Sequence, residues 1–257
     1  MEKIDHLGNR EWKQTFWEQP FHTFGPPNGG DKLLFYHGDT WTRDDPIMRL
    51  VQLDADGNMI CVDKFTERGL FRLLWTKEGS LFHAKIKTDM ITTSYEIRKY
   101  HINEAGNYCL ANQWTFCDPD LGYYAGEWSV SPSGNYLCYT GGRPTSQGHW
   151  SNKIILFSLE AQGSIKRIFI NWDTPIDLSP TPHYAAPVVT DSGVVLSAWH
   201  MPKGNSIFLT DFSEPEIPTQ RVRNSSKTLI SMEEHNSQLY LFERAGKWLY
   251  LSVFDMP

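Results

Sequence analysis

The sequence has no concentration of positive charge. Its 257 residues include 24 Lys and Arg against 30 Asp and Glu, which gives a net charge of −6, and the basic residues do not cluster. A surface that binds nucleic acid or an anionic membrane needs clustered Lys and Arg. The charge pattern therefore argues against both kinds of partner, whereas a basic protein partner is compatible with it.

Long hydrophobic runs are missing as well. Residues Met1–Gly8 have no apolar core, so we expect no signal peptide. A membrane-spanning helix needs about 20 predominantly apolar residues in succession, and the sequence contains no such run. We therefore expect a cytoplasmic location.

Cysteine is scarce, and its spacing shows no pairing. There is no Cys-x-x-Cys motif, and three of the four cysteines lie in strand-like runs; the four are Cys61, Cys109, Cys117 and Cys138. This pattern favours small apolar residues in a reducing compartment. Metal binding or a disulfide is the alternative.

Familiar catalytic motifs are also absent. The sequence contains no Gly-x-Ser-x-Gly, no His-Glu-x-x-His and no Gly-rich phosphate loop. The histidines at 37, 149, 183 and 200 are scattered and lack the His-x-x-x-His spacing of a metal site. We predict no catalytic residue, no metal and no cofactor.

What the sequence does contain is strands and turns. Aromatic residues make up 14%, and there are 19 Gly and 15 Pro, which suits sheets joined by tight turns. The clearest unit is Trp128–Thr140, which reads as a strand, a turn at Ser131–Gly134 and a second strand. Pro fixes φ and Gly tolerates a positive φ, so this turn is well specified.

The stretch Trp128–Thr140 resembles the repeat of TolB-like (WD-repeat-like) β-propellers. In that family a strand runs into Ser-Pro-Asp-Gly and then into an aromatic or aliphatic strand, and Ser133 stands where the family usually has Asp. The resemblance implies a β-propeller fold. It implies little about activity, because propellers carry many functions.

The same strand–turn–strand pattern recurs along the chain. Its turns are 49, 55, 59 and 44 residues apart and lie at Gly30, Gly79, Gly134, Gly193 and Ser237. Such spacing fits propeller blades of four strands with their loops. We predict an all-β, five-bladed β-propeller that forms a single domain over residues 1–257; a β-sandwich is the alternative.

The last copy is one strand short. It ends with its third strand, Trp248–Val253, whereas Leu7–Asn9 followed by Arg10–Trp17 matches the turn and fourth strand of an earlier copy. We predict that Glu11–Trp17 pairs with Trp248–Val253 and completes the last blade. This offset closure would remove open strand edges.

We expect the binding site on the face built from the long loops, because long loops on a rigid frame concentrate binding residues. These loops span 37–45, 117–127, 141–150 and 172–184. Exposed Trp and Tyr together with Arg and His are typical of a binding surface. The candidate binding residues are Trp41, Arg43, Asp118, Asp120, Tyr123, Tyr124, Arg143, His149, Trp150, His183 and Tyr184. Their alternative role is structural, as gap fillers between blades or caps of turns.

We predict a recognition module that binds a protein partner and has no catalytic activity. One version is a bacterial immunity protein that occludes a toxin, since a propeller is a fold that can serve such a role. A glycoside hydrolase or a sugar-binding propeller is the alternative. Glycoside hydrolysis needs two carboxyl groups on either side of the glycosidic bond. Arabinanase-like glycosidases carry an acidic residue on the first strand of the first blade, whereas that strand here, Phe21–Phe24, contains none. The unequal loops argue against equal sugar pockets in all blades.

Overall fold

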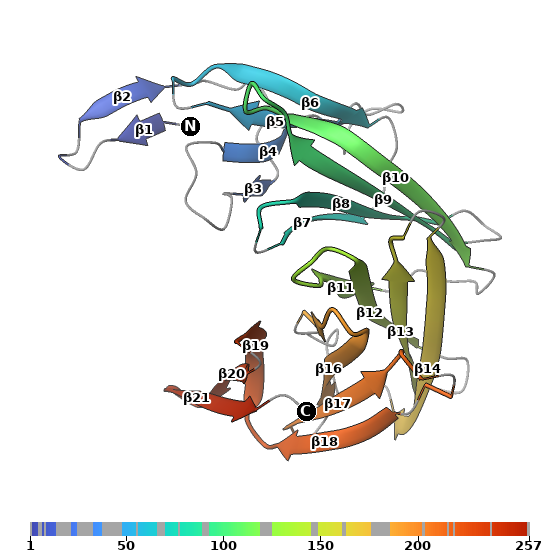
Figure 1. The fold of residues 1–257 in the computed structure, drawn as a ribbon. Helices are drawn as coiled ribbons and strands as arrows, with labels where there is room; N and C mark the ends of the chain where they lie inside the picture. Colours follow the sequence, from blue (N-terminus) through green and yellow to red (C-terminus); the bar gives the residue numbers. More distant parts are fainter. Residues whose placement is uncertain are drawn as a thin grey trace. The chain divides into compact units, whose positions relative to one another are not determined.

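The described part of the chain is built from antiparallel β-sheets. In the computed structural model of residues 1–257 no helix occurs among the described residues (Figure 1), so none of them forms a membrane-crossing helix. The described residues are 2–4, 7, 9–13, 22–24, 33–37, 48–54, 56–65, 70–76, 78–88, 93–118, 125–144, 149–160, 163–175, 186–201, 204–214, 216–217, 219–236 and 238–255. The prediction of an all-β chain is confirmed.

The chain divides into two compact units, and the first comprises Met1–Asp89 and Ser94–Cys117. In it β1 (Glu2–Ile4) pairs with β2 (Arg10–Lys13). A second sheet consists of β3 (His22–Phe24), β4 (Leu33–His37), β5 (Met48–Leu53) and β6 (Met59–Phe65). The third consists of β7 (Leu70–Trp75), β8 (Leu81–Thr88), β9 (Thr93–Ile102) and β10 (Tyr108–Asp118).

The second unit comprises Met90–Thr93 and Asp118–Pro257. Its first sheet consists of β11 (Ala125–Val130), β12 (Tyr136–Pro144), β13 (His149–Ser158) and β14 (Ser164–Pro175). The next consists of β15 (Val188–Val189), β16 (Val194–Met201), β17 (Gly204–Asp211) and β18 (Thr219–Ser225). The last has three strands: β19 (Thr228–His235), β20 (Gln238–Ala245) and β21 (Trp248–Asp255).

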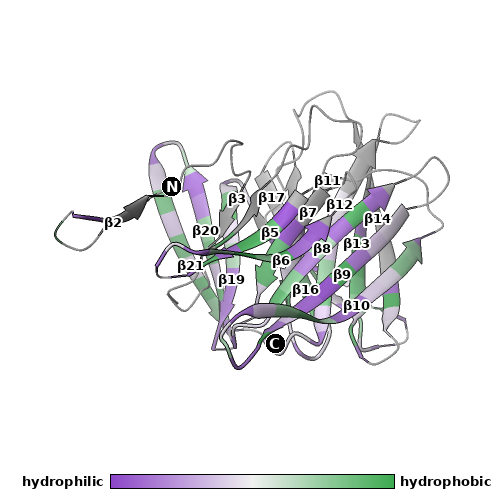
Figure 2. Ribbon diagram, turned by 90° about the horizontal axis from the view of Figure 1, so that it is seen from above, coloured by the Kyte–Doolittle hydropathy of each residue, from purple (hydrophilic) through white to green (hydrophobic). Residues whose placement is uncertain are grey.

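Each unit has its own core between neighbouring sheets. In the first unit, Leu34 and Leu50 pack with Leu73, Leu81 and Tyr100. In the second unit one apolar cluster joins sheets β11–β14 and β15–β18, and another joins β15–β18 and β19–β21. Hydrophobic and hydrophilic residues alternate along parts of the strands (Figure 2), as expected where one face of a pleated strand is buried.

The strand–turn–strand unit that the sequence made most evident is present. Trp128 is buried in β11, with its ring centroid 5.0 Å from that of Tyr139 and 5.5 Å from that of Phe157. The amide of Gly134 donates to the carbonyl of Ser131 at 2.9 Å, and Gly134 has φ of 76°. A positive φ strains residues that carry a Cβ, so glycine suits this turn.

The structure does not confirm the predicted closure. The strand β2, which contains the start of the segment Glu11–Trp17, pairs with β1. Among the described residues, β21 is the edge of a three-stranded sheet. The second half of that segment lies outside the described residues. Five of the sheets correspond in sequence order to the five predicted copies.

All four predicted loops are shorter than expected, which is a correction, because β4, β10, β11, β12, β13 and β14 extend into them. Most of the predicted loop 141–150 belongs to β12 and β13, so Arg143, His149 and Trp150 lie on strands. Asp118 likewise ends β10 and does not lie in a loop. The strands extend further because backbone pairing continues past the apolar run: Pro144 still opposes Trp150 in the register of β12 and β13.

Candidate functional site

Most of the predicted binding residues cannot be placed. Trp41, Arg43, Asp120, Tyr123, Tyr124, His183 and Tyr184 lie outside the described residues. For Arg143, His149 and Trp150 the structure describes the strand backbone and not the side chain. A site on the predicted loop face therefore stays a prediction.

Asp118 is the one predicted residue whose side chain is described. It forms an ion pair with Lys153 of β13, and both side chains are fully buried. A buried charge of this kind needs its partner, because removal from water costs several kcal/mol per ion. In this setting the Asp118 carboxylate holds Lys153 and is closed to solvent. Among the described residues there is also no group of three or more His, Cys, Asp or Glu that could hold a metal ion.

The described surface offers a different candidate site, the strand β21. More than half of the exposed large apolar side chains among the described residues lie on β20 and β21. Leu249 is 74% exposed, Trp248 64% and Leu251 57%. Single exposed apolar residues are common, but a contiguous apolar strip marks an interaction surface.

The register of β20 and β21 assigns the side chains of β21 to two faces. Residues directly opposite each other on paired strands share a face, and Leu239 opposes Phe254, while Glu243 opposes Tyr250. Leu239 and Glu243 are buried on the side of the core that joins this sheet to β15–β18. The aromatic side chains therefore lie on that face, and Leu249, Leu251 and Val253 lie on the other.

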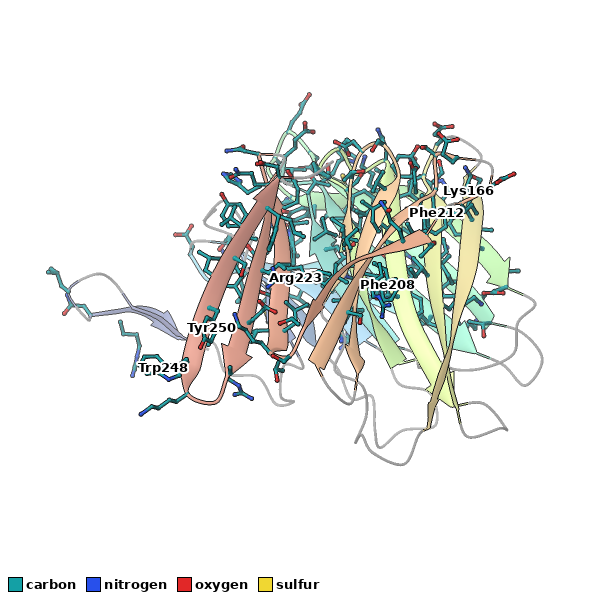
Figure 3. The ribbon with its side chains drawn as sticks, turned by 90° about the horizontal axis from the view of Figure 1, so that it is seen from below. Lys166, Phe208, Phe212, Arg223, Trp248 and Tyr250 are labelled. Atoms are coloured by element: carbon teal, nitrogen blue, oxygen red, sulfur yellow. The ribbon has the colours of Figure 1, made fainter. Side chains whose placement is uncertain are left out.

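Cations lie against the aromatic face. The guanidinium of Arg223, on β18, lies 4.7 Å from the ring centroid of Phe254. The ammonium groups of Lys227 and Lys247 lie 3.7 Å from the Tyr250 ring and 5.8 Å from the Trp248 ring. Figure 3 shows Tyr250, Trp248 and Arg223 in this part of the molecule. These contacts give the strip a positive border although the whole chain is negative.

Arg223 is held in place by a buried carboxylate. Its Nη2 donates to Glu243 Oε2 at 2.9 Å, and Glu243 is 1% exposed. Next to this pair is a cavity of about 470 Å³ between sheets β15–β18 and β19–β21. Its lining is mainly apolar and includes Leu196, Ile207, Leu209, Val222, Leu241 and Phe254. The cavity has the size of a small-ligand site, and it meets the aromatic face of β21 at Phe254.

Sequence reasoning placed β21 correctly as a strand but did not nominate it as a site. The signal was present: Trp248–Phe254 contains no charged residue and has large apolar side chains at odd and even positions. Such a run predicts a strand covered on both faces. Because the closing strand was expected to cover it, its exposure was not considered.

Comparisons with known proteins support the fold. No protein-family model and no curated protein sequence matches the chain. Among solved structures, prolyl oligopeptidase B from Galerina marginata is similar with a TM-score of 0.53 and 11% identity, over 92% of this chain and 34% of the peptidase. The Synechocystis apocarotenoid oxygenase is similar with a TM-score of 0.50 and 12% identity, over 88% of this chain and 58% of the oxygenase.

A third similarity is weaker. The periplasmic gluconolactonase PpgL of Pseudomonas aeruginosa matches with a TM-score of 0.46 and 14% identity, over 88% of this chain and 69% of the lactonase. The chain spans about a third of the length of the peptidase that it matches. At such low identity a likeness concerns fold alone. The similarities to the peptidase and the oxygenase support a propeller-like arrangement of small antiparallel sheets.

Proposed function

We propose that the chain is a non-catalytic recognition protein that binds a partner protein by adding a strand of the partner to β21. The observation that carries this proposal is the exposed, charge-free apolar strip Trp248–Phe254 on β21, which is an edge strand among the described residues. An edge strand presents unpaired N–H and C=O groups to any strand that can align with it. Peptide recognition by strand addition uses this backbone pairing for affinity and the side-chain faces for specificity.

The side chains of the strip suit a protein partner. Trp, Tyr and Arg are enriched among the residues that dominate binding energy. Trp248 and Tyr250 lie on the aromatic face of β21, and Arg223 contacts Phe254 on the same face. On the second face, Leu249 and Leu251 offer apolar surface that is already exposed. Covering apolar surface contributes roughly 25 cal/mol per Å².

The charges near the strip indicate the chemistry of the partner strand. Lys247 and Lys227 lie at the beginning of β21, against Trp248 and Tyr250, and Asp255 lies at its end. An antiparallel partner strand places its C-terminal residues opposite the beginning of β21. We therefore propose an apolar strand with acidic residues near its C-terminal end.

The finer predictions from the sequence stay proposals. The loop residues around Trp41, Tyr123 and Trp150 would form a second contact region for the same partner, and an immunity-type role would make that partner a toxin. A cytoplasmic location belongs to the same proposal. A glycoside hydrolase could not use Asp118 as one of its two carboxyl groups, because Asp118 is buried against Lys153.

We also propose that the fold is a five-bladed propeller. The support is that five sheets follow the five sequence copies in order, and only β19–β21 has three strands among the described parts of these sheets. The predicted closing segment Glu11–Trp17 competes with a partner strand for β21. The experiment below separates the two occupants.

The test is a binding titration with synthetic peptides of the length of β21, eight residues. One peptide alternates Val and Thr and ends in two Glu; its control ends in two Lys. We expect the Glu peptide to bind, and Leu249→Lys with Leu251→Lys to abolish binding without loss of stability, because both side chains are exposed. Leu110→Lys, at an apolar position of β10 that is also exposed, is the matched control and should bind normally.

Charge reversal makes the test specific for the orientation. Lys247→Glu should weaken the Glu peptide and strengthen the Lys peptide, and added salt should weaken the Glu peptide. Equal binding of both peptides to every variant would contradict the proposal. Binding that occurs only after removal of residues 1–19 would assign the edge to the chain's own strand and overturn the partner proposal.

A further inference from the structure

A second cavity, separate from β21, has a different chemistry. It encloses about 370 Å³ between sheets β11–β14 and β15–β18. Its polar lining consists of Ser158, Glu160, Ser164, Lys166, Ser192 and Ser213. Ligand sites are concave and combine apolar surface with a small number of convergent polar groups. This cavity has both features and is therefore a candidate ligand site.

One wall of the cavity follows directly from strand register. Tyr136, Ser158 and Ser164 oppose one another across β12, β13 and β14. Two residues away on each of β13 and β14, Leu156 opposes Lys166. Because side chains two residues apart share a face, both rows face the same side, and the sheet presents hydroxyl groups beside an ammonium group.

The opposite wall is formed by two turns of the neighbouring sheet. The amide of Phe212 donates to the carbonyl of Gly193 at 3.2 Å, and Lys166 Nζ donates across the cavity to the carbonyl of Phe212 at 2.6 Å. Figure 3 shows Lys166 and Phe212 close together. The ammonium group is thereby fixed at the rim with further N–H donors available, since Lys carries three.

A hydrogen-bonded bridge keeps the two walls at a fixed separation. The backbone amide and the hydroxyl of Ser133 both donate to Asp191 Oδ1, at 2.9 Å and 2.5 Å. These residues belong to the turns that precede β12 and β16. The cavity is therefore built before a ligand arrives, which reduces the entropy cost of binding.

The floor of the cavity is apolar. Leu156 and the buried Phe212 line it together with the ring of Tyr136. A sugar ring has a hydrophobic C–H face and a rim of hydroxyl groups, so it can lie on such a floor while its hydroxyls reach serine, lysine and carboxylate groups. Each serine hydroxyl can donate and accept, which matches a polyol better than a purely accepting anion.

We propose that this cavity is a binding site for a small neutral polyol, such as a monosaccharide unit. Lys166 donates to a ligand hydroxyl, Glu160 accepts from one, and Ser158 and Ser164 do both. A phosphate is disfavoured, because Lys166 is the one cation among the described residues of the lining and Glu160 offsets its charge. The acidic neighbour Asp211, bonded through Oδ1 to the Ser213 hydroxyl at 2.6 Å, adds to this repulsion.

The test is saturation-transfer NMR with D-glucose, D-mannose and myo-inositol, and with inorganic phosphate as the anionic probe. We expect at least one polyol to bind with a Kd of about 1 mM, as is usual for a ligand of so few atoms. Lys166→Met and Ser164→Val should each weaken binding by about tenfold, the effect of one lost hydrogen bond to a charged or buried group.

The exposed Lys64→Met, on β6 in the other unit, is the matched control and should leave polyol binding unchanged. Thermal unfolding of each variant checks that the turns stay folded, and Ser158→Ala provides a milder change at the same wall. Absence of binding by all three polyols, binding of phosphate alone, or full binding by Lys166→Met and Ser164→Val would each overturn the proposal. None of these outcomes depends on β21.

Discussion

Lys153 and Asp118 show how a charged residue can be predicted as a binding group and turn out to be a core group. Sequence reasoning saw an Asp in a polar connection, but the pair is fully buried. The sequence could not show this, because the partner is 35 residues away and neither neighbour of Lys153 signals a buried ion pair. Burial of a charge is decided by tertiary contacts and not by local pattern.

Removing one member of this pair should be costly. We expect Asp118→Asn to lower the free energy of unfolding by about 3–5 kcal/mol, because Lys153 would remain buried without its counter-charge. The double variant Asp118→Leu with Lys153→Met should recover much of this loss, since both charges of the pair are then removed. Urea unfolding of the three proteins measures both effects, and a single variant as stable as wild type would contradict the buried pair.

His83 should give the protein a pH dependence of its own. Burial lowers the pKa of His83 to about 3, and the nearby charges of Arg98 and Lys85 contribute. In the unfolded chain His83 binds a proton near pH 6.5, whereas in the folded protein it stays neutral down to about pH 3. The free energy of unfolding is therefore highest above pH 6.5 and decreases as the pH falls towards 3. The loss amounts to about 1.4 kcal/mol per pH unit.

The variant His83→Leu tests this dependence. Between pH 6 and pH 4 we expect its free energy of unfolding to fall less steeply than that of the wild type, by about 1.4 kcal/mol per pH unit. Urea unfolding at several pH values gives both profiles. Parallel profiles would show that His83 takes up its proton in the folded state as readily as in the unfolded state.

At the level of elements, the tight turns were predictable and the strand ends were not. Gly134 and Gly193, with φ of 76° and 85°, occupy turns that the sequence identified from Ser-Gly pairs. In contrast, β12 and β13 continue through Arg143 and Trp150. The polar residues at these strand ends do not alternate with apolar ones, so the sequence does not mark them as part of a strand. Backbone hydrogen bonds between β12 and β13 can nevertheless continue whatever the side chains are.

The close approach of β11 and β12 makes a further prediction. Gly126 opposes Gly141, and a Cβ at Gly126 would overlap the carbonyl oxygen of Thr140. We expect Gly126→Ala to destabilise the protein by about 1–3 kcal/mol, because the two backbones must separate. Ser129→Ala on the same strand is the control and should change stability little, as measured by urea unfolding. Equal effects of the two changes would contradict the close contact.

At the level of the whole molecule, the all-β class and the grouping of consecutive strands into sheets followed from the repeat spacing and the turns alone. Turn residues recur at blade spacing, and each copy forms an antiparallel sheet in sequence order. The predicted pairing of Glu11–Trp17 with Trp248–Val253 would join distant parts of the chain. Local sequence pattern indicates which strands need a partner but does not identify that partner. The same limit applies to the site: exposure of β21 depends on what lies beside it.

The uninterrupted strip Trp248–Phe254 has a practical consequence. Natural edge strands usually carry a lysine, a proline or a bulge that blocks unwanted pairing. The strip Trp248–Phe254 contains neither lysine nor proline. We therefore expect the isolated protein to aggregate at high concentration through edge-to-edge strand pairing. Co-expression with a peptide that pairs with β21 should raise the yield of non-aggregated protein.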